Sequence, residues 1–140
     1  MRHSRAIRFC YDELLTLVVP SFLSRHRSDP AMNPVLTIAK RAALSASRIL
    51  LRHFDQLERL TVTAKQRNDF VSEADIQAEQ DIIQTLRKTF PNHGVLAEES
   101  GEQSGQDEYQ WVIDPLDGTT NFLHGIPHFA ISIAFRHKNR

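Results

Sequence analysis

Apolar residues recur at spacings of three and four over residues 34–54, which is the period of one face of an α-helix. The members of this stripe are Leu36, Ala39, Ala43, Ala46, Leu50 and Phe54. Asn33 is a natural N-cap for such a helix, and Pro34 is a natural first helical residue. A second stripe predicts another helix, which ends at Pro91–Gly94. Its members are Ala78, Ile82, Ile83, Leu86 and Phe90.

The start of the second helix is expected at Ser72, with Asp75 three residues later as a weak capping partner. The polar segment Lys65–Asn68 is expected to form a turn, and Asp69–Val71 a brief extended piece. The chain before Ser72 is therefore predicted to be non-helical.

Three short segments further along the chain predict strands, at residues 95–97, 109–113 and 129–135. The polar segment Ser100–Glu108 between the first two is expected to be a loop, and Asp114–Gly118 a turn. The last strand has no onward partner in the sequence, and an unpaired apolar edge is a liability that complete proteins avoid. The order of elements predicts an α/β (α+β) fold and an incomplete chain.

Residues 1–31 differ from the rest, because they are rich in Arg and His and show no clear period. The apolar stretch Leu14–Leu23 is interrupted by Pro20 and is shorter than a membrane span. Asp12 and Glu13 stand where the apolar part of a signal peptide would begin, and no clean cleavage site follows. We therefore predict that residues 1–31 are an extension outside the native protein, which would start at Met32.

Composition adds three constraints. Of the 140 residues, 41% are hydrophobic and 24% charged, as in ordinary globular proteins. The 17 basic and 17 acidic residues balance, so the net charge gives no reason to expect direct binding of nucleic acid or of a membrane. Cys10 is the single cysteine, which excludes an internal disulfide and favours a cytoplasmic setting.

Acidic residues follow the predicted strands. Glu98 and Glu99 come after the first strand, Asp114 ends the second, and Asp117 lies three residues later beyond the rigid Pro115. Like charges held close together repel unless a cation lies between them. Hard oxygen ligands of this kind suit Mg²⁺, so the pattern indicates a magnesium site.

The segment Gly118–Asn121 follows these carboxylates directly. A glycine with hydroxyl residues at a helix start offers free backbone N–H groups, which bind phosphate oxygens. Carboxylates before a phosphate cradle indicate metal-assisted phosphoryl transfer. The alternative is purely structural, because Asp-Pro and Asp-Gly are common turn formers and Glu98–Glu99 alone is typical of a solvated pair.

Three ordered motifs resemble the inositol monophosphatase family, and its bacterial branch most closely. The segment Trp111–Phe122 is similar to the first signature of that family, Ala97–Ser100 to its upstream Glu-Glu-Ser motif, and Asn68–Asp75 to its first loop and helix start. The resemblance covers residues 32–140. It implies the N-terminal half of such a domain, and hence part of the layered αβαβα sandwich of the inositol monophosphatase and fructose-bisphosphatase-like sugar phosphatases.

The same resemblance implies metal ligands. Glu98, Asp114 and the backbone carbonyl of Leu116 would bind a first Mg²⁺. Asp117 would bind a second, with Asp114 bridging the two ions.

It also implies contacts with substrate. Gly118 and Thr119 would give backbone N–H groups to the phosphate, and Thr119, with Glu98 or Asp75, would orient the attacking water. Which carboxylate acts as the base stays open. The substrate-binding set implied in this way consists of Glu98, Leu116, Asp117, Gly118 and Thr119.

The activity implied is Mg²⁺-dependent, lithium-sensitive hydrolysis of inositol monophosphate or a related small phosphate monoester. The second signature of the family, Trp-Asp-x-Ala followed by Ala or Gly, lies beyond the end of this sequence, so we expect little turnover from this fragment alone.

Two alternatives remain. Bacterial relatives are linked to ribosomal RNA transcription, which implies a non-catalytic antitermination role with RNA polymerase as partner. The other alternative is a truncated product without function. Full-length relatives are usually dimers, so a homodimer is expected of a complete form.

Overall fold

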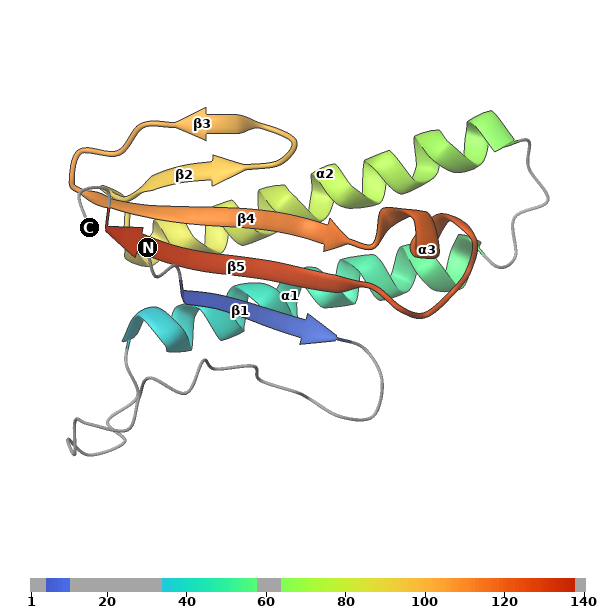
Figure 1. The fold of residues 1–140 in the computed structure, drawn as a ribbon, viewed down its shortest axis with the longest axis horizontal. Helices are drawn as coiled ribbons and strands as arrows, with labels where there is room; N and C mark the ends of the chain where they lie inside the picture. Colours follow the sequence, from blue (N-terminus) through green and yellow to red (C-terminus); the bar gives the residue numbers. More distant parts are fainter. Residues whose placement is uncertain (1–4, 11–33, 58–63, 138–140) are drawn as a thin grey trace.

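The structure, a computed structural model, describes residues 5–10, 34–57 and 64–137. Figure 1 shows two long helices lying side by side along a sheet, with a short helix at the end of one strand. The elements in chain order are β1 (Arg5–Cys10), α1 (Pro34–Leu57), α2 (Ala64–Thr89), β2 (Gly94–Ala97), β3 (Gly101–Gln103), β4 (Tyr109–Asp117), α3 (Thr119–Leu123) and β5 (Ala130–His137).

The five strands form one mixed sheet in the order β1-β5-β4-β2-β3. The β2 and β4 strands are parallel, with Ala97 opposite Ile113, and all other pairs are antiparallel. The predicted mixed α/β fold is confirmed. The parallel pair positions the candidate site, because parallel neighbours end at the same edge of a sheet.

The outer strand β1 comes from the segment predicted to be an extension. Its residues 5–10 pair with β5 from Arg5 opposite Phe135 to Cys10 opposite Ala130. The prediction that the last strand lacks a partner was therefore wrong. Backbone pairing needs only an extended chain, so a segment without a hydrophobic period can still supply an edge strand. The division of the chain at residues 31 and 32 stays a prediction.

Helix α1 begins at Pro34, as predicted, while the N-cap expected at Asn33 lies outside the described residues. The alanines of its stripe are fully buried, and Leu50 and Phe54 are buried with them. Small residues on this face of α1 allow α2 to pack closely against it. At this contact the ring of His53 in α1 lies 4.8 Å from the ring of Phe70 in α2.

Helix α2 starts at Ala64, eight residues before the expected start, so the predicted turn and extended piece were wrong. Val71 and Ala74 are buried, whereas Asn68 and Asp69 are exposed. The polar residues thus occupy the outer face of a helix whose inner face continues the apolar stripe. Ser72 lies on the helix surface rather than at its end.

One hydrophobic core joins the helices to the sheet. Trp111 and Ile113 of β4 and Ile133 of β5 are each at most 2% exposed. At the far end of the sheet, the ring of Phe54 lies 5.3 Å from each of the rings of Phe122 and Phe129. This aromatic contact fixes the short helix α3 against α1.

The strands differ from the prediction in two places. The segment Ser100–Glu108 is not all loop, because β3 pairs with β2 through Gly101 opposite Ala97. The strand expected to end at Asp114 continues to Asp117, past a register irregularity. Both differences arise from main-chain pairing, which polar and turn-forming residues do not prevent. Among the described residues, no helix is long and apolar enough to cross a membrane.

Candidate functional site

The site is built where β2 and β4 end side by side. Glu98 follows β2 directly, and its backbone N–H donates to the carbonyl of Ile113 at 3.2 Å. Asp114 follows Ile113 in β4, so the parallel pairing places Glu98 and Asp114 next to each other. The predicted meeting of these two carboxylates at strand ends is therefore present in the structure.

The end of β4 is bulged. Asp114 is opposite Ser132 and Asp117 is opposite Ala130, so β4 has one residue more than β5 over this stretch. In a regular strand, side chains three positions apart point to opposite faces, and a bulge changes that direction. The bulge lets Asp114 and Asp117 interact, since the charge of Asp117 acts on Asp114.

Short-range hydrogen bonds fix this bulge. The Leu116 N–H donates to Oδ1 of Asp114 at 3.2 Å. The Thr119 hydroxyl donates to the Leu116 carbonyl at 2.9 Å. The carbonyl predicted as a metal ligand thus already accepts one hydrogen bond, and a carbonyl oxygen has a second lone pair to offer.

Gly118 separates the bulge from α3 and has left-handed backbone angles, with φ at 96°. A Cβ at this position would lie 3.0 Å from the carbonyl oxygen of His128 and 3.2 Å from Cα of Phe129. Both the backbone angle and the close approach therefore require glycine here. Thr119 begins α3, a helix of only five residues.

Asp75 lies in α2, close to Glu98, Glu99 and Asp114, and is 5% exposed. Its Oδ1 is buried without a hydrogen-bond partner among the described atoms. The pKa of Asp75 is raised from 3.8 to about 7, mainly by burial and then by the charges of Glu99, Glu98, Asp114 and Glu79, in that order. Asp75 therefore lies among several carboxylates that repel it.

Asp114 has the same kind of environment. Burial is the largest cause that raises its pKa to about 6, followed by the charges of Glu98 and Asp117 and a hydrogen bond with Glu98. The hydrogen bond from the Leu116 N–H acts in the opposite direction. We call Asp75, Glu98, Glu99, Asp114 and Asp117 the acidic cluster.

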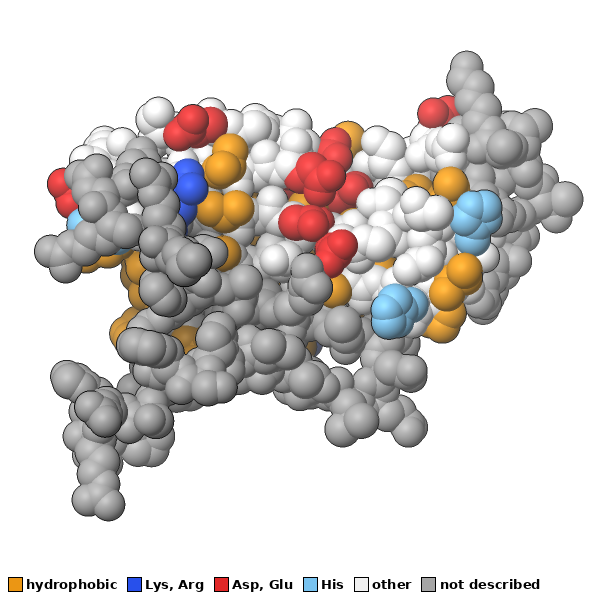
Figure 2. Space-filling view, in the orientation of Figure 1, with side chains coloured by type: hydrophobic (Ala, Val, Ile, Leu, Met, Phe, Trp, Pro, Cys, Tyr) orange, Lys and Arg blue, Asp and Glu red, His pale blue; other side chains and the backbone are white. Residues whose placement is uncertain are grey.

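The acidic cluster has the chemistry of a cation site. Figure 2 shows Asp and Glu side chains gathered in the middle of one face, and the Lys and Arg side chains of the described residues that are visible there lie to one side. Among the described residues, no three side chains of His, Cys, Asp or Glu converge closely enough to hold a metal ion as they stand. The unpartnered oxygen of Asp75 and the repulsion at Asp114 fit a divalent cation, whose charge would relieve both.

The sequence prediction missed Glu79. Its carboxylate is 2% exposed, and it accepts the backbone N–H groups of Glu99 at 2.8 Å and of Ser100 at 3.0 Å. The position offered one signal, because Glu79 follows Asp75 by four residues and so lies on the same helix face, between the buried Ala78 and Ile82. An acidic residue inside an apolar stripe indicates a specific partner.

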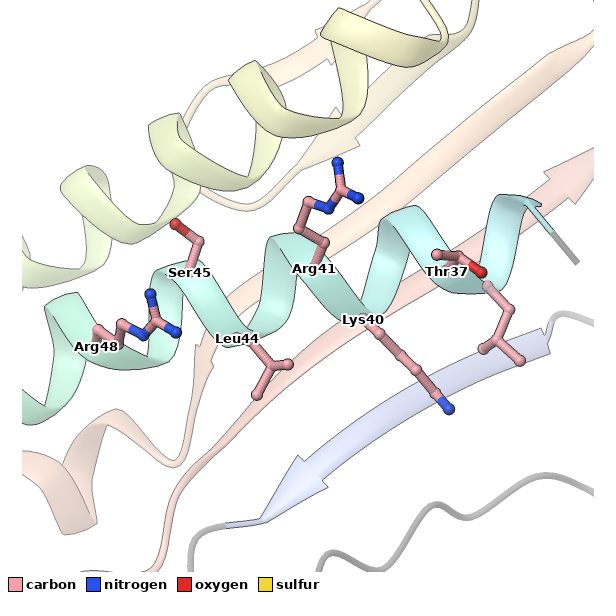
Figure 3. A pocket seen from close by; sticks show the side chains of 7 residues that line it. Thr37, Lys40, Arg41, Leu44, Ser45 and Arg48 are labelled. Carbon is pink, nitrogen blue, oxygen red and sulfur yellow. The ribbon is translucent and has the colours of Figure 1, made fainter. Parts of the chain in front are cut away.

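The described part of the chain also has two surface grooves. One, of about 450 Å³, has a described lining that comes from α1 alone, including Lys40, Arg41 and Arg48 (Figure 3). The other, of about 820 Å³, runs between α2 and the segment 99–103 and includes Glu79 and Glu99. Neither described lining contains Glu98, Asp114 or Asp117, so these three carboxylates lie outside both grooves.

Comparison with known proteins agrees with the motifs. The model of the inositol monophosphatase family matches residues 31–140. The chain is 51% identical over 112 residues to a protein named Nus factor SuhB from Pseudomonas aeruginosa, which covers 78% of this chain and 41% of that protein. The protein of the same name from Escherichia coli is 49% identical over 110 residues.

Solved structures give the same result. An extragenic suppressor protein suhB from Bartonella henselae has a TM-score of 0.66 at 41% identity, covering 77% of this chain and 41% of that one. An inositol monophosphatase from Anabaena has a TM-score of 0.60 at 39% identity, covering 74% of this chain and 35% of that one. The chain thus spans well under half the length of the relatives it matches.

Proposed function

Because the chain belongs to the inositol monophosphatase family, we propose that it carries the first half of a Mg²⁺-dependent site for hydrolysing inositol monophosphate or a related small phosphate monoester. The observation that carries this proposal is the acidic cluster. Its carboxylates come from the turn after β2, from β4 and from α2, and burial and repulsion raise the pKa of Asp75 and of Asp114. Carboxylates held this close repel one another when no cation is bound, whereas a bound cation is stabilised by all of them.

Three side chains and one carbonyl would hold the metal. Glu98, Asp114 and the Leu116 carbonyl form the first set, and Asp117 with Asp114 the second. The geometry of the site supports this division, because the bulge in β4 allows Asp114 and Asp117 to interact while Glu98 approaches from the turn after β2. Bound Mg²⁺ supplies charge neutralisation and lowers the pKa of a bound water.

The remaining residues would bind and orient the substrate. Gly118 and Thr119 would give backbone N–H groups to the phosphate, next to Glu98, Leu116 and Asp117. The left-handed backbone angle of Gly118 supports its role in binding phosphate, because it turns the chain sharply at the end of β4.

The water would be oriented by Thr119 together with Glu98 or Asp75. Asp75 is 5% exposed and lies close enough to Glu98 and Asp114 for their charges to act on it, which supports a place for it beside the attacking water. In the structure the Thr119 hydroxyl donates to Leu116, so its oxygen is still able to accept a hydrogen bond.

Phosphate release from inositol 1-phosphate tests the proposal, with and without Mg²⁺ and with millimolar Li⁺. We expect little turnover from the 140-residue chain and Mg²⁺-dependent, Li⁺-inhibited turnover once it is joined to the remaining part of a relative such as the Pseudomonas protein. An Asp117→Asn version of the joined protein is the matched control and should be inactive. A joined protein that folds but releases no phosphate would contradict the proposal.

A second candidate is a non-catalytic role in ribosomal RNA transcription antitermination, with RNA polymerase as the partner. The observation that favours it is the name Nus factor carried by relatives from several bacteria. Such a role would place the protein in the cytoplasm, and a complete form would be a homodimer. Neither feature is needed for the chemistry above.

Capture of purified RNA polymerase separates the two candidates. The chain joined to the rest of a relative is compared with its Asp117→Asn version, which lacks one metal ligand. Equal capture by both would support a binding role that needs no turnover. Absence of capture by either would leave hydrolysis as the single proposal.

A further inference from the structure

The turn at residues 98–100 is held by a buried charge from another element. The two oxygens of Glu79 each accept one backbone N–H, from Glu99 at 2.8 Å and from Ser100 at 3.0 Å. A buried carboxylate is costly unless it is hydrogen-bonded, and hydrogen bonds to a charged acceptor are stronger than neutral ones. Glu79 is 2% exposed, so its contacts with this turn are shielded from water.

The helix is the fixed partner in this contact. Glu79 lies in α2 next to the buried Ala78 and one turn before the buried Ile82 and Ile83. Helix α2 also packs directly against β4. The carboxylate of Glu79 is therefore anchored by the core, and the turn is tied to it rather than the reverse.

Glu98 is consequently fixed from two sides. Its own N–H is bonded to Ile113 of β4, and the next two N–H groups are bonded to Glu79. An exposed carboxylate on an unsupported loop would spend most of its time away from Asp114. With its backbone held at both ends, the Glu98 side chain stays within reach of Asp114, with which it is hydrogen-bonded.

We infer that Glu79 is a positioning residue for the metal site: it binds the backbone of Glu99 and Ser100 and thereby holds the Glu98 carboxylate against Asp114. The inference rests on the proposed function, because it assigns Glu98 to a metal. Glu79 itself does not touch the ion or the substrate. It acts through the backbone, and its geometry matters as well as its charge.

Three variants of the 140-residue chain test this. Glu79→Gln removes the charge and one acceptor, whereas Glu79→Asp keeps the charge but is too short to reach both N–H groups. Glu73→Gln makes the same chemical change as Glu79→Gln on an exposed part of α2 and is the control. Each is titrated with Mn²⁺ as the probe, following the paramagnetic broadening of the Glu98 and Asp114 amide resonances.

We expect Glu79→Gln and Glu79→Asp each to raise the Mn²⁺ midpoint about 10-fold, the usual cost of losing a group that orients a ligand, and Glu73→Gln to change it by less than about two-fold. If Glu79→Asp binds like the wild type and only Glu79→Gln is weakened, the effect is one of charge and the inference is wrong. If the wild type shows no broadening at these amides, the proposed metal site itself fails, which is a distinguishable result.

If a variant does not fold, the inference can still be tested on the wild-type chain. Hydrogen exchange should show the Glu99 and Ser100 amides protected, although both residues are exposed in a turn. Folding of each variant is checked by the fluorescence of Trp111, which is 1% exposed. Exchange of these two amides at the rate of an unprotected chain would overturn the inference without any substitution.

Discussion

The acidic turn at Glu98–Ser100 is tied down by a side chain from α2, whereas the bulged end of β4 is held by contacts within a few residues of itself. In the first, Glu79 lies 20 and 21 residues before its partners. In the second, Asp114 and Thr119 each bond to Leu116, two and three residues away. One turn depends on the packing of the helix and the other on its own sequence.

This difference predicts unequal responses to change. A locally bonded turn keeps its shape as long as its own residues are present. A turn held from a distance moves whenever the helix that holds it shifts. The acidic cluster needs both, because Glu98 comes from the first and Asp114 and Asp117 from the second.

The largest effect on metal affinity is expected from Asp114→Asn. This substitution removes the carboxylate that interacts both with Glu98 of the first turn and with Asp117 of the bulged end of β4. Losing a direct ligand should weaken Mn²⁺ binding by roughly 100-fold or more, beyond the cost of losing an orienting group. The metal-free chain should become no less stable, because the substitution removes repulsion from Glu98 and Asp117. Isothermal titration with Mn²⁺ and urea unfolding measure the two quantities. Metal affinity equal to that of the wild type would contradict the assignment.

A glycine substitution tests the local turn alone. Gly118→Ala should lower the free energy of unfolding by roughly 2 kcal/mol, because φ is 96° and the new Cβ would approach the His128 carbonyl. Gly125→Ala is the control, since its φ is 70° but no atom lies within 4 Å of the new Cβ, and about 1 kcal/mol is expected there. Urea unfolding followed by Trp111 fluorescence gives both values. Equal losses would show that the close approach at Gly118 is unimportant.

The pH dependence tests the carboxylates between the two turns. In the folded chain the pKa of Asp75 is raised from 3.8 to about 7 and that of Asp114 to about 6. The folded state therefore binds more protons than the unfolded state between pH 4 and 7. The contribution of these two carboxyl groups to the free energy of unfolding is fully present below about pH 4 and is lost as the pH rises to 7.

For the metal-free chain we expect the free energy of unfolding to fall by roughly 1.5 kcal/mol from pH 5 to pH 8, less than the full linkage value because the carboxyl groups titrate together. Asp75→Asn should remove most of this fall, and Asp69→Asn, on the exposed side of α2, should not. Urea unfolding at several pH values checks it. A stability that rises over this range would have the wrong sign.

The smallest effect is expected for single hydroxyl contacts. Thr119→Val should cost about 1 kcal/mol, because the hydrogen bond to the Leu116 carbonyl is lost in a partly buried place. Ser100→Ala should cost less than about 0.5 kcal/mol, since the bond that its hydroxyl accepts from Gln103 is exposed. Thermal unfolding of the two variants side by side tests whether the local turn depends more on its own side chains.

The contacts that lie close in sequence were the ones that could be predicted. The helical stripe of α1 and the glycine at 118 both lie within short segments, where spacing and backbone preference decide the outcome. The sequence also placed Glu98 and Asp114 at the ends of consecutive strands, but it did not predict that these strands are parallel and therefore end at one edge of the sheet.

Other features could not be predicted in this way. The start of α2 was placed too late because residues 65–68 were predicted to form a turn and residues 69–71 an extended piece, although Asn68 and Asp69 occupy the outer face of a helix. The β1 and β3 strands have no apolar alternation that reveals them, and their pairing depends on where neighbouring strands lie. The role of Glu79 depends on which loop reaches the helix.

By itself the sequence determined the mixed α/β class, the first helix, the glycine between the acidic strand and α3, and the family to which the chain belongs. These follow from periodicity, backbone preference and short motifs, all of which act over a few neighbouring residues. Only the tertiary structure decided that Glu79 holds the turn at Glu99 and Ser100 and that Asp75 lies buried beside the other carboxylates. The physical reason is that both depend on the docking of α2 against β4, which brings together groups that no local pattern connects.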